Sequence, residues 1–227
     1  GIPRYAYSNI IHKRKGRNME IYICAIIFIM GSFFGSFYTL AVYRIPLHKD
    51  IVHEHSFCPN CNHKLGILDL FPIFSYIFLK GKCRYCSQKI RIRYFLLEIL
   101  SGIFFLLLFK SMRIDLLNLE LIKLIDFAFL VLIFSAVAIN AGISKEHKKF
   151  QKSVTIFGLI ITAIYILYLY IVEKANIHRY AIYLIIPLAN VLIYLLTKKV
   201  EKINTPFIQS VITIILILLT TFIIYKF

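Results

Sequence analysis

Long blocks of consecutive apolar residues dominate the chain, and short polar or basic segments separate them. The first block covers residues 21–43, which at about 1.5 Å of helical rise per residue can cross a hydrocarbon core of about 30 Å. Further blocks follow at residues 94–109, 119–141, 154–172, 181–196 and 207–225, the first and fourth of these being short. The pattern predicts an all-α polytopic membrane protein with about six transmembrane helices.

Basic residues gather in the segments between the apolar blocks. The chain has 27 Lys and Arg against 11 Asp and Glu, a net charge of +16. In a soluble protein this balance would suggest nucleic acid, but it is typical of the cytoplasmic loops of membrane proteins, so no nucleic-acid partner is expected. Segments 44–93, 145–152 and 198–202 fall on one side and carry most of the basic charge. We predict that this side is cytoplasmic and that the chain before residue 21 lies outside.

Residues 1–18 carry five basic residues and do not begin with methionine. No small-residue cleavage site follows the first apolar block, so a secretory signal is not indicated. A basic segment outside the membrane would also contradict the charge rule. We therefore expect residues 1–18 to be a non-native or leader extension, with Met19 as the functional start.

Small residues interrupt the first apolar block. Gly31 and Gly35 are four residues apart, and Ser32 and Ser36 follow them directly. Small side chains at this spacing allow another helix to approach closely. We expect this face of the first helix to pack against a neighbouring helix.

The basic segment 44–93 contains two Cys-x-x-Cys pairs, Cys58 with Cys61 and Cys83 with Cys86. Four thiolates supplied as two close pairs can surround Zn²⁺ tetrahedrally, although the spacer is slightly longer than is usual in zinc ribbons. Disulfides, free thiols or a redox pair are the alternatives, but a redox motif needs one pair, and cytoplasmic thiols stay reduced. We predict a structural zinc in a small tetra-cysteine ribbon, and we expect Cys24, within an apolar block, to be inert.

Between the two cysteine pairs, residues 68–79 read LDLFPIFSYIFL. This run is apolar but too short to span a bilayer. It is typical of a segment that lies at the membrane surface or dips into it. Four histidines also fall in the basic segment, at positions 48, 53, 55 and 63, and with four cysteines available we expect them to be solvated rather than metal ligands.

Three sequence elements occur together in a fixed order. They are GSFFGSFYTLAVYRIP at residues 31–46, CPNCNHKL at residues 58–65, and DLFPIFSYIFLKGKCRYCSQKIRIRY at residues 69–94, with Glu98 following. Together they resemble the amino-terminal part of the type IV prepilin peptidases, the integral-membrane leader peptidases of bacteria. The resemblance covers about residues 31–100 and divides the chain into a family-like region, 19–110, and a divergent transmembrane region, 111–227. Thr39 and Phe95 are small departures from the family pattern.

The resemblance implies an activity and a location. Members of this family remove the short basic leader of a type IV prepilin, a secretion pseudopilin or a competence pseudopilin at the cytoplasmic face of the bacterial plasma membrane. Many members also methylate the new amino terminus with S-adenosylmethionine, and many bind zinc through the tetra-cysteine loop. We therefore expect a multi-pass protein of the bacterial cytoplasmic membrane, with a prepilin and the lipid bilayer as partners and S-adenosylmethionine as a candidate cofactor.

The resemblance also implies an aspartic protease, which needs two carboxylates that share a proton. Where the family's first aspartate is expected, this chain has Asn140, and no Gly-x-Gly-Asp occurs for the second. Asp69, Glu98 and Asp126 are the acids close enough to apolar blocks to be tuned by burial, so they are the candidate catalytic residues.

Each of these acids has an ordinary structural alternative. Asp69 would cap the segment it opens. Glu98 would pair with Arg91 or Arg93, and Asp126 with Lys123 at the i, i+3 spacing.

Two functions follow from these observations. The first is a prepilin leader peptidase, with or without methyl transfer. The alternative is a proteolytically inactive family member, a zinc-ribbon membrane scaffold that binds prepilins or assembly partners without cutting them. The absence of a paired-aspartate motif argues against hydrolysis, while nothing in the sequence argues against binding.

Overall fold

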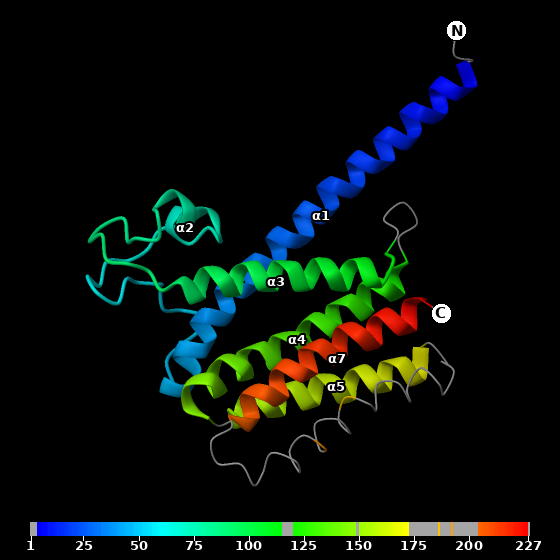
Figure 1. Cartoon of the computed structure of the whole chain (residues 1–227). Coiled ribbons are helices and arrows are strands. Elements are labelled where there is room, and N and C mark those ends of the chain that lie inside the picture. The colour runs from blue at the N-terminus through cyan, green and yellow to red at the C-terminus, as the bar shows by residue number, and fades with distance from the viewer. Residues whose placement is uncertain are drawn as a thin grey trace.

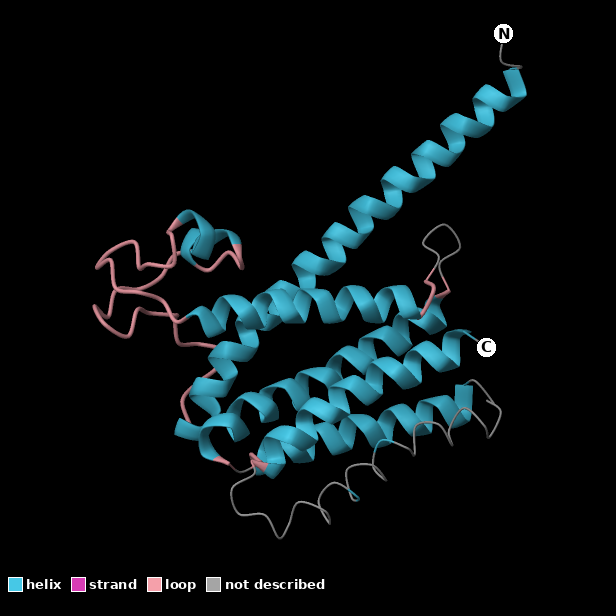
Figure 2. Cartoon of the chain, in the orientation of Figure 1, coloured by secondary structure: helices cyan, strands magenta, loops and turns pink. Residues whose placement is uncertain are grey.

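The structure is a computed structural model that describes residues 4–114, 120–148, 150–172, 186, 192 and 204–226, with backbone only before residue 18. Helices account for nearly all regular structure in these residues: α1 Arg4–Arg44, α2 Phe74–Phe78, α3 Ile92–Ser111, α4 Leu121–His147, α5 Lys152–Val172 and α7 Thr205–Lys226. Short 3-10 turns lie at Ile45–Leu47 and Ile67–Asp69. The predicted all-α class is confirmed for the part of the chain described (Figure 2).

Five of the described helices are long and apolar enough to cross a membrane. Their spans are Asn18–Leu47, Ile92–Ser111, Leu121–His147, Lys152–Val172 and Thr205–Lys226. They correspond to five of the six predicted blocks. The remaining block, residues 181–196, lies outside the described residues except for Ile186 and Leu192. The first helix is longer than predicted. It begins at Arg4 and continues without a break through the polar residues that precede the apolar block.

The membrane-capable helices form a bundle in which one end carries the cysteine segment (Figure 1). The end of α1 and the start of α3 lie there, together with the turn between α4 and α5 and the start of α7. Asn204, just before α7, donates its side-chain amide to the Ser144 carbonyl near the end of α4 at 2.6 Å. The basic segments at residues 44–93 and 145–152 therefore share one end of the bundle, as the charge pattern predicted for them. The third basic segment of that prediction, residues 198–202, lies outside the described residues.

The close helix pair that the small residues predicted is α1 with α3. A Cβ at Gly31 would lie 2.8 Å from the Phe105 side chain, and one at Gly35 would lie 2.8 Å from the Glu98 Cα. A Cβ at Gly102, on α3, would similarly lie 2.8 Å from Phe28. On α1 the nearest atoms include the α3 backbone, the Ser101 carbonyl oxygen at Gly31 and the Glu98 Cα at Gly35, so these two positions leave no room for a side chain. At Gly102 the nearest atoms are side-chain atoms of Phe28 and Ser32.

Aromatic packing joins this pair to α4. Phe104 of α3 stacks on Phe134 of α4 with ring centroids 3.6 Å apart, and both side chains are buried. Tyr38 of α1 is also buried and lies 2.7 Å, oxygen to oxygen, from Ser135 of α4. A hydroxyl pair inside an apolar bundle satisfies both polar groups and fixes the register of α1 against α4.

Candidate metal centre and the acids around it

The two cysteine pairs fold into two copies of one local structure. In the first, the Cys58 amide donates to the His63 carbonyl at 3.0 Å, and the Asn62 amide donates to the Cys58 carbonyl at 2.8 Å. In the second, Cys83 and Ser87 make the equivalent bonds, to the carbonyls of Gln88 and Cys83. Isolated β-bridges, Phe57 with Lys64 and Lys82 with Lys89, close the base of each copy.

The repeat could have been read from the sequence, which shows no other sign of internal duplication. CPNCNHKL and CRYCSQKI share both cysteines, a polar pair after the second cysteine, a lysine and then an aliphatic residue. Asn62 and Ser87 occupy the same position in the two copies and both adopt a left-handed backbone, with φ of 57° and 58°. Each copy is a tight knuckle that turns its two sulfurs toward the same point.

The four sulfurs converge on one point. The Sγ atoms of Cys58, Cys61, Cys83 and Cys86 all lie within 4.8 Å of one another, and Cys58 and Cys86 are 3.8 Å apart. Tetrahedral Zn²⁺ with Zn–S bonds of about 2.3 Å requires sulfurs about 3.8 Å apart. All five cysteines of the chain are free thiols, and Cys24 lies apart from the cluster in α1. The donor set and its spacing fit a zinc site.

Hydrogen bonds lower the pKa of two thiols of the cluster, Cys58 and Cys86. The Gln88 amide and then the Asn60 side chain lower the pKa of Cys86 to about 6. At Cys58 burial acts to raise the pKa, but the amides of Cys61 and Asn60 lower it overall. Cys61 behaves oppositely: although the His63 amide lowers its pKa, desolvation and the neighbouring sulfurs of Cys86 and Cys58 raise it to about 11. Four thiolates so close together need a cation to coexist.

Asp69 fastens the second knuckle to the segment between the two pairs. Its Oδ1 accepts from Arg84 Nε at 2.6 Å, and its Oδ2 accepts from the Tyr85 hydroxyl and the Gly66 amide, each at 3.1 Å. Burial acts to raise the pKa of Asp69, but the bonds from Arg84, Gly66 and Tyr85 hold it below its usual value. The capping was predicted for the segment that Asp69 opens, but its carboxylate instead caps the preceding turn, Ile67–Asp69, through the Gly66 amide, and α2, which follows Ile73, begins without a side-chain cap. Asp69 also contacts both residues that separate Cys83 from Cys86.

We expect Asp69→Asn to loosen the metal without removing a ligand. The change weakens the bond to Arg84, and groups that orient metal ligands typically contribute 10- to 100-fold in affinity. Zinc transfer from the purified full-length protein to a chromogenic chelator should be at least about tenfold faster than in the unchanged protein. Asp50→Asn is the matched control, because Asp50 is an acid of the same basic segment that contacts Val52 and His53 and neither cysteine pair. Equal release rates for the two variants would contradict this role of Asp69.

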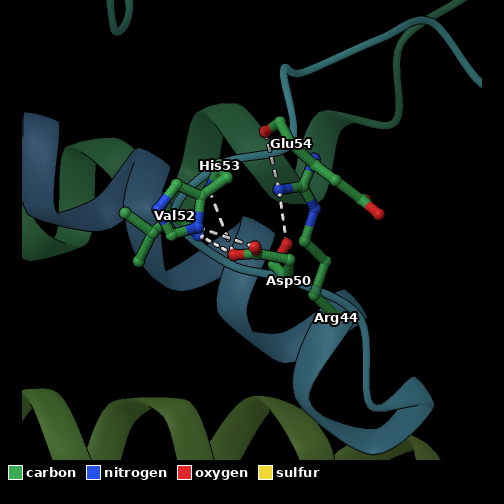
Figure 3. Close-up of polar contacts among 5 residues, drawn as sticks. All are labelled: Arg44, Asp50, Val52, His53 and Glu54. Carbon is green, nitrogen blue, oxygen red and sulfur yellow. Dashed lines mark hydrogen bonds and ion pairs between the residues drawn. The ribbon is translucent and has the colours of Figure 1, made fainter.

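Arg44 organises the other part of the basic segment, and its role was not predicted from the sequence. Its side chain is buried, and Nη1 donates to the carbonyls of Asp50 and Glu54 at 2.9 Å while Nη2 donates to that of His55 at 3.0 Å. Figure 3 shows the guanidinium enclosed by this loop, with Asp50 held in turn by the amides of Val52 and His53. The end of α1 thereby fixes the loop that leads to Cys58.

Glu98 is buried near the start of α3, where it holds the segment between the cysteine pairs. Its Oε2 accepts from the Ile73 amide at 2.8 Å. From the sequence, Glu98 was expected to pair with Arg91 or Arg93. Arg93 instead forms an ion pair with Glu146 of α4, so that part of the expectation was wrong. The fold brings Glu146 to Arg93 across 53 residues of sequence, a contact that local spacing could not indicate.

Asp126 is buried at the opposite end of the bundle. Its Oδ2 accepts from the Tyr225 hydroxyl of α7 at 2.5 Å. Lys123, its expected partner, pairs with Glu120 at 3.0 Å. Asp69, Glu98 and Asp126 thus lie in three different places, so the structure does not bring the three candidate acids together as a catalytic pair.

Asn140 has a structural role at the turn between α4 and α5. Its Oδ1 accepts from the Gln151 amide at 3.0 Å, and its Nδ2 donates to Thr155 Oγ1 at 3.4 Å. Thr155 in turn donates to the Gln151 carbonyl at 2.9 Å. The side chain uses both a donor and an acceptor here, which an amide supplies and a carboxylate does not.

Comparison with known proteins identifies one region of the chain. Residues 29–112 match the family described as "Bacterial Peptidase A24 N-terminal domain". The chain is 42% identical over 81 residues to a "Prepilin leader peptidase/N-methyltransferase" of Bacillus subtilis, a match that covers 36% of this chain and 33% of that protein. It is 30% identical over 155 residues to the protein of the same name from Vibrio cholerae, covering 55% of this chain and 61% of the relative.

The family match, residues 29–112, contains the cysteine cluster. A third relative, the "Prepilin leader peptidase/N-methyltransferase" of Myxococcus xanthus, is 38% identical over 79 residues, which is 35% of this chain and 24% of that protein. The chain thus spans between about a quarter and three fifths of the length of these three relatives. No solved structure matches the chain.

Proposed function

Because the amino-terminal region of this chain belongs to the type IV prepilin peptidase family, we propose that the protein acts on type IV prepilins or competence pseudopilins as a prepilin leader peptidase-like membrane protein. The observation that carries the proposal is the cysteine cluster held between α1 and α3, inside the region that matches the family. Relatives similar to this chain carry names that include both leader peptidase and N-methyltransferase.

The proposed location of this action is the cytoplasmic face of the bacterial plasma membrane. Nine Lys and Arg residues lie between Arg44 and Arg93 inclusive, against three acids. The turn between α4 and α5, which is also basic, lies at the same end of the bundle. An excess of basic residues is retained on the cytoplasmic side during insertion. Cytoplasmic placement also keeps the four thiols reduced and available to zinc.

Leader cleavage requires two carboxylates close enough for one to act as base on water while the other donates a proton to the scissile carbonyl. The three candidate acids do not form such a pair. Asp69 is engaged by Arg84 and Tyr85, Glu98 by the Ile73 amide, and Asp126 is at the far end of the bundle.

Asn140 supports a second candidate function, in which the protein binds prepilins without cutting them. Its amide is fitted to the Gln151 amide and to Thr155, so this position serves the turn between α4 and α5. A zinc-ribbon scaffold that presents a prepilin to partners needs the cysteine cluster and the membrane helices but no carboxylate pair. Methyl transfer from S-adenosylmethionine remains a separate proposal, since it needs no such pair either.

The test is the amino-terminal mass of a prepilin or pseudopilin co-expressed with this protein in a host that lacks its own leader peptidase. The scaffold function predicts that the leader stays intact and that the prepilin copurifies with the full-length protein, and the separation of Asp69, Glu98 and Asp126 favours this outcome. A leader removed after glycine would establish cleavage and direct attention to Asp69, Glu98 and Asp126. An intact leader without copurification would contradict both candidate functions.

Asn140→Asp provides the matched variant for the same assay. The residues that Asn140 contacts, Gln151 and Thr155, are not acids, so we expect the leader to remain intact here as well. Cleavage by this variant would show that another acid does lie within reach. The protein must be confirmed as folded and membrane-bound by its zinc content in each case.

A further inference from the structure

The segment between the two cysteine pairs folds back along the membrane helices. Phe71 packs edge-on against Phe33 of α1 with ring centroids 5.3 Å apart, and Tyr76 stacks on Phe95 of α3 at 4.7 Å. The Ile73 amide donates to Glu98. Figure 1 shows α2 beside the first part of α3, with the rest of the cysteine segment further out.

These contacts determine how far along the membrane helices the segment between the cysteine pairs lies. Phe33 is 11 residues before Arg44, the last residue of α1, which is about 16 Å along the helix axis. Glu98 is six residues, or about 9 Å, beyond the start of α3 at Ile92. Both residues lie within membrane-capable spans. A segment attached at these positions lies alongside the apolar part of the helices rather than beyond their ends.

The outward side of this segment is apolar. Ile67 is 85% exposed, Leu68 75% and Phe78 80%, and Phe74 and Ile77 are about half exposed. Large aliphatic and aromatic side chains this exposed, on a segment that already contacts membrane helices, are suited to a hydrocarbon environment.

A strongly basic stretch follows directly. Residues 80–91 include five exposed cations and no acid: Lys80, Lys82, Arg84, Lys89 and Arg91. Arg84 is bound to Asp69, while the others are spread along the chain between the apolar segment and α3. Basic residues beside an inserted apolar element are attracted to the anionic headgroups of the same leaflet.

We propose that residues 67–79 form a re-entrant anchor. Its apolar side chains enter the acyl region of one leaflet, while residues 80–91 bind anionic lipid headgroups. Glu98 and Phe33 hold the anchor against the helix pair, and the cysteine cluster is thereby fixed at the headgroup layer. This anchor is independent of whether the protein cleaves prepilins.

The chain contains no tryptophan, so one introduced tryptophan reports its own surroundings. The full-length Phe78→Trp variant, reconstituted in vesicles that contain anionic phosphatidylglycerol, should lose about half or more of its fluorescence to lipids brominated in the upper acyl chain. Leu100→Trp, on an exposed position of α3, is the control for a spanning helix. Val52→Trp is the aqueous control, because Val52 is 82% exposed in the loop held by Arg44.

The outcomes separate the anchor from its alternatives. If Phe78→Trp and the second probe, Ile67→Trp, both behave like Val52→Trp in protein that retains zinc, the anchor does not insert. If the tryptophans of Phe78→Trp and Ile67→Trp become shielded from water only when a prepilin peptide is added, the surface is a protein docking site and the proposal is wrong.

The headgroup contact is tested separately. In anionic vesicles, the double substitution Lys80→Gln and Lys82→Gln should reduce the quenching of the Phe78→Trp probe. Placing the Phe78→Trp variant in purely neutral vesicles should also reduce this quenching. Unchanged quenching in both conditions would overturn the headgroup part of the proposal.

Discussion

The double substitution Cys58→Ser and Cys83→Ser is expected to abolish metal binding. The unchanged protein should bind about one Zn²⁺ per chain, because its four sulfurs converge at tetrahedral spacing. The variant removes one thiolate from each knuckle and leaves two ligands, which cannot hold a structural zinc. Metal analysis of the full-length protein purified in detergent should find zinc in the unchanged protein and essentially none in the variant.

The same variant should also loosen the cysteine segment. Apart from the four sulfurs, the contacts between the two knuckles are small: the Asn60 side chain donates to Cys86 Sγ at 3.6 Å, and the His63 ring lies on Tyr85 with centroids 3.5 Å apart. Limited proteolysis should cut the variant within residues 44–93 while the membrane helices stay intact. Cys24→Ser is the matched control, because Cys24 lies in α1 away from the cluster, and it should retain full zinc. Purified protein without stoichiometric zinc, or a double variant that keeps it, would contradict the assignment.

Gly35→Leu is expected to separate α1 from α3 and to destabilise the protein by several kcal/mol. Even a Cβ at this position would lie 2.8 Å from the Glu98 Cα and from the Leu97 carbonyl oxygen. Both atoms belong to the backbone, so the helix as a whole must move to relieve the contact. Glu98 and Phe33 hold the anchor against this same helix pair.

The measurement is the thermal stability of the detergent-solubilised full-length protein, followed by loss of helical signal and by zinc release. Gly66→Leu is the control, because it introduces the same side chain where a Cβ would meet nothing closer than 3.7 Å. We expect Gly66→Leu to melt close to the unchanged protein and Gly35→Leu to melt at a markedly lower temperature. Equal melting temperatures would show that α1 and α3 do not need this close contact.

The membrane helices and the metal cluster could be predicted because each depends on local sequence. A spanning helix satisfies its backbone internally and needs only enough consecutive apolar residues, so the block lengths located the five described spans. A Cys-x-x-Cys knuckle is also local, so two of them predicted the four sulfurs that the structure brings together. The family-like region was recognisable from the same stretch.

The partners of the buried polar residues could not be predicted, because they come from distant parts of the chain. Arg93 was expected beside Glu98 but pairs with Glu146, and Asp126 was expected beside Lys123 but accepts from Tyr225. Spacing rules give only contacts within one helix, whereas a buried polar group takes whichever partner the packing of helices supplies. The role of Arg44 was missed for a related reason, since its acceptors are backbone carbonyls, which have no sequence signature.

The sequence by itself determined that this is a helical membrane protein with a cysteine-rich, basic segment between its first two spanning helices. Apolar length and cysteine spacing are sufficient for these features. Membrane insertion depends on the apolar length of each segment, and metal binding depends on the spacing of cysteines that are close in the sequence. Tertiary structure alone decided that Gly35 packs on Glu98, that the segment between the cysteine pairs lies back against Phe33 and Phe95, and that the candidate acids stay apart. These outcomes depend on how the helices pack, and that packing is set by many contacts across the whole bundle at once.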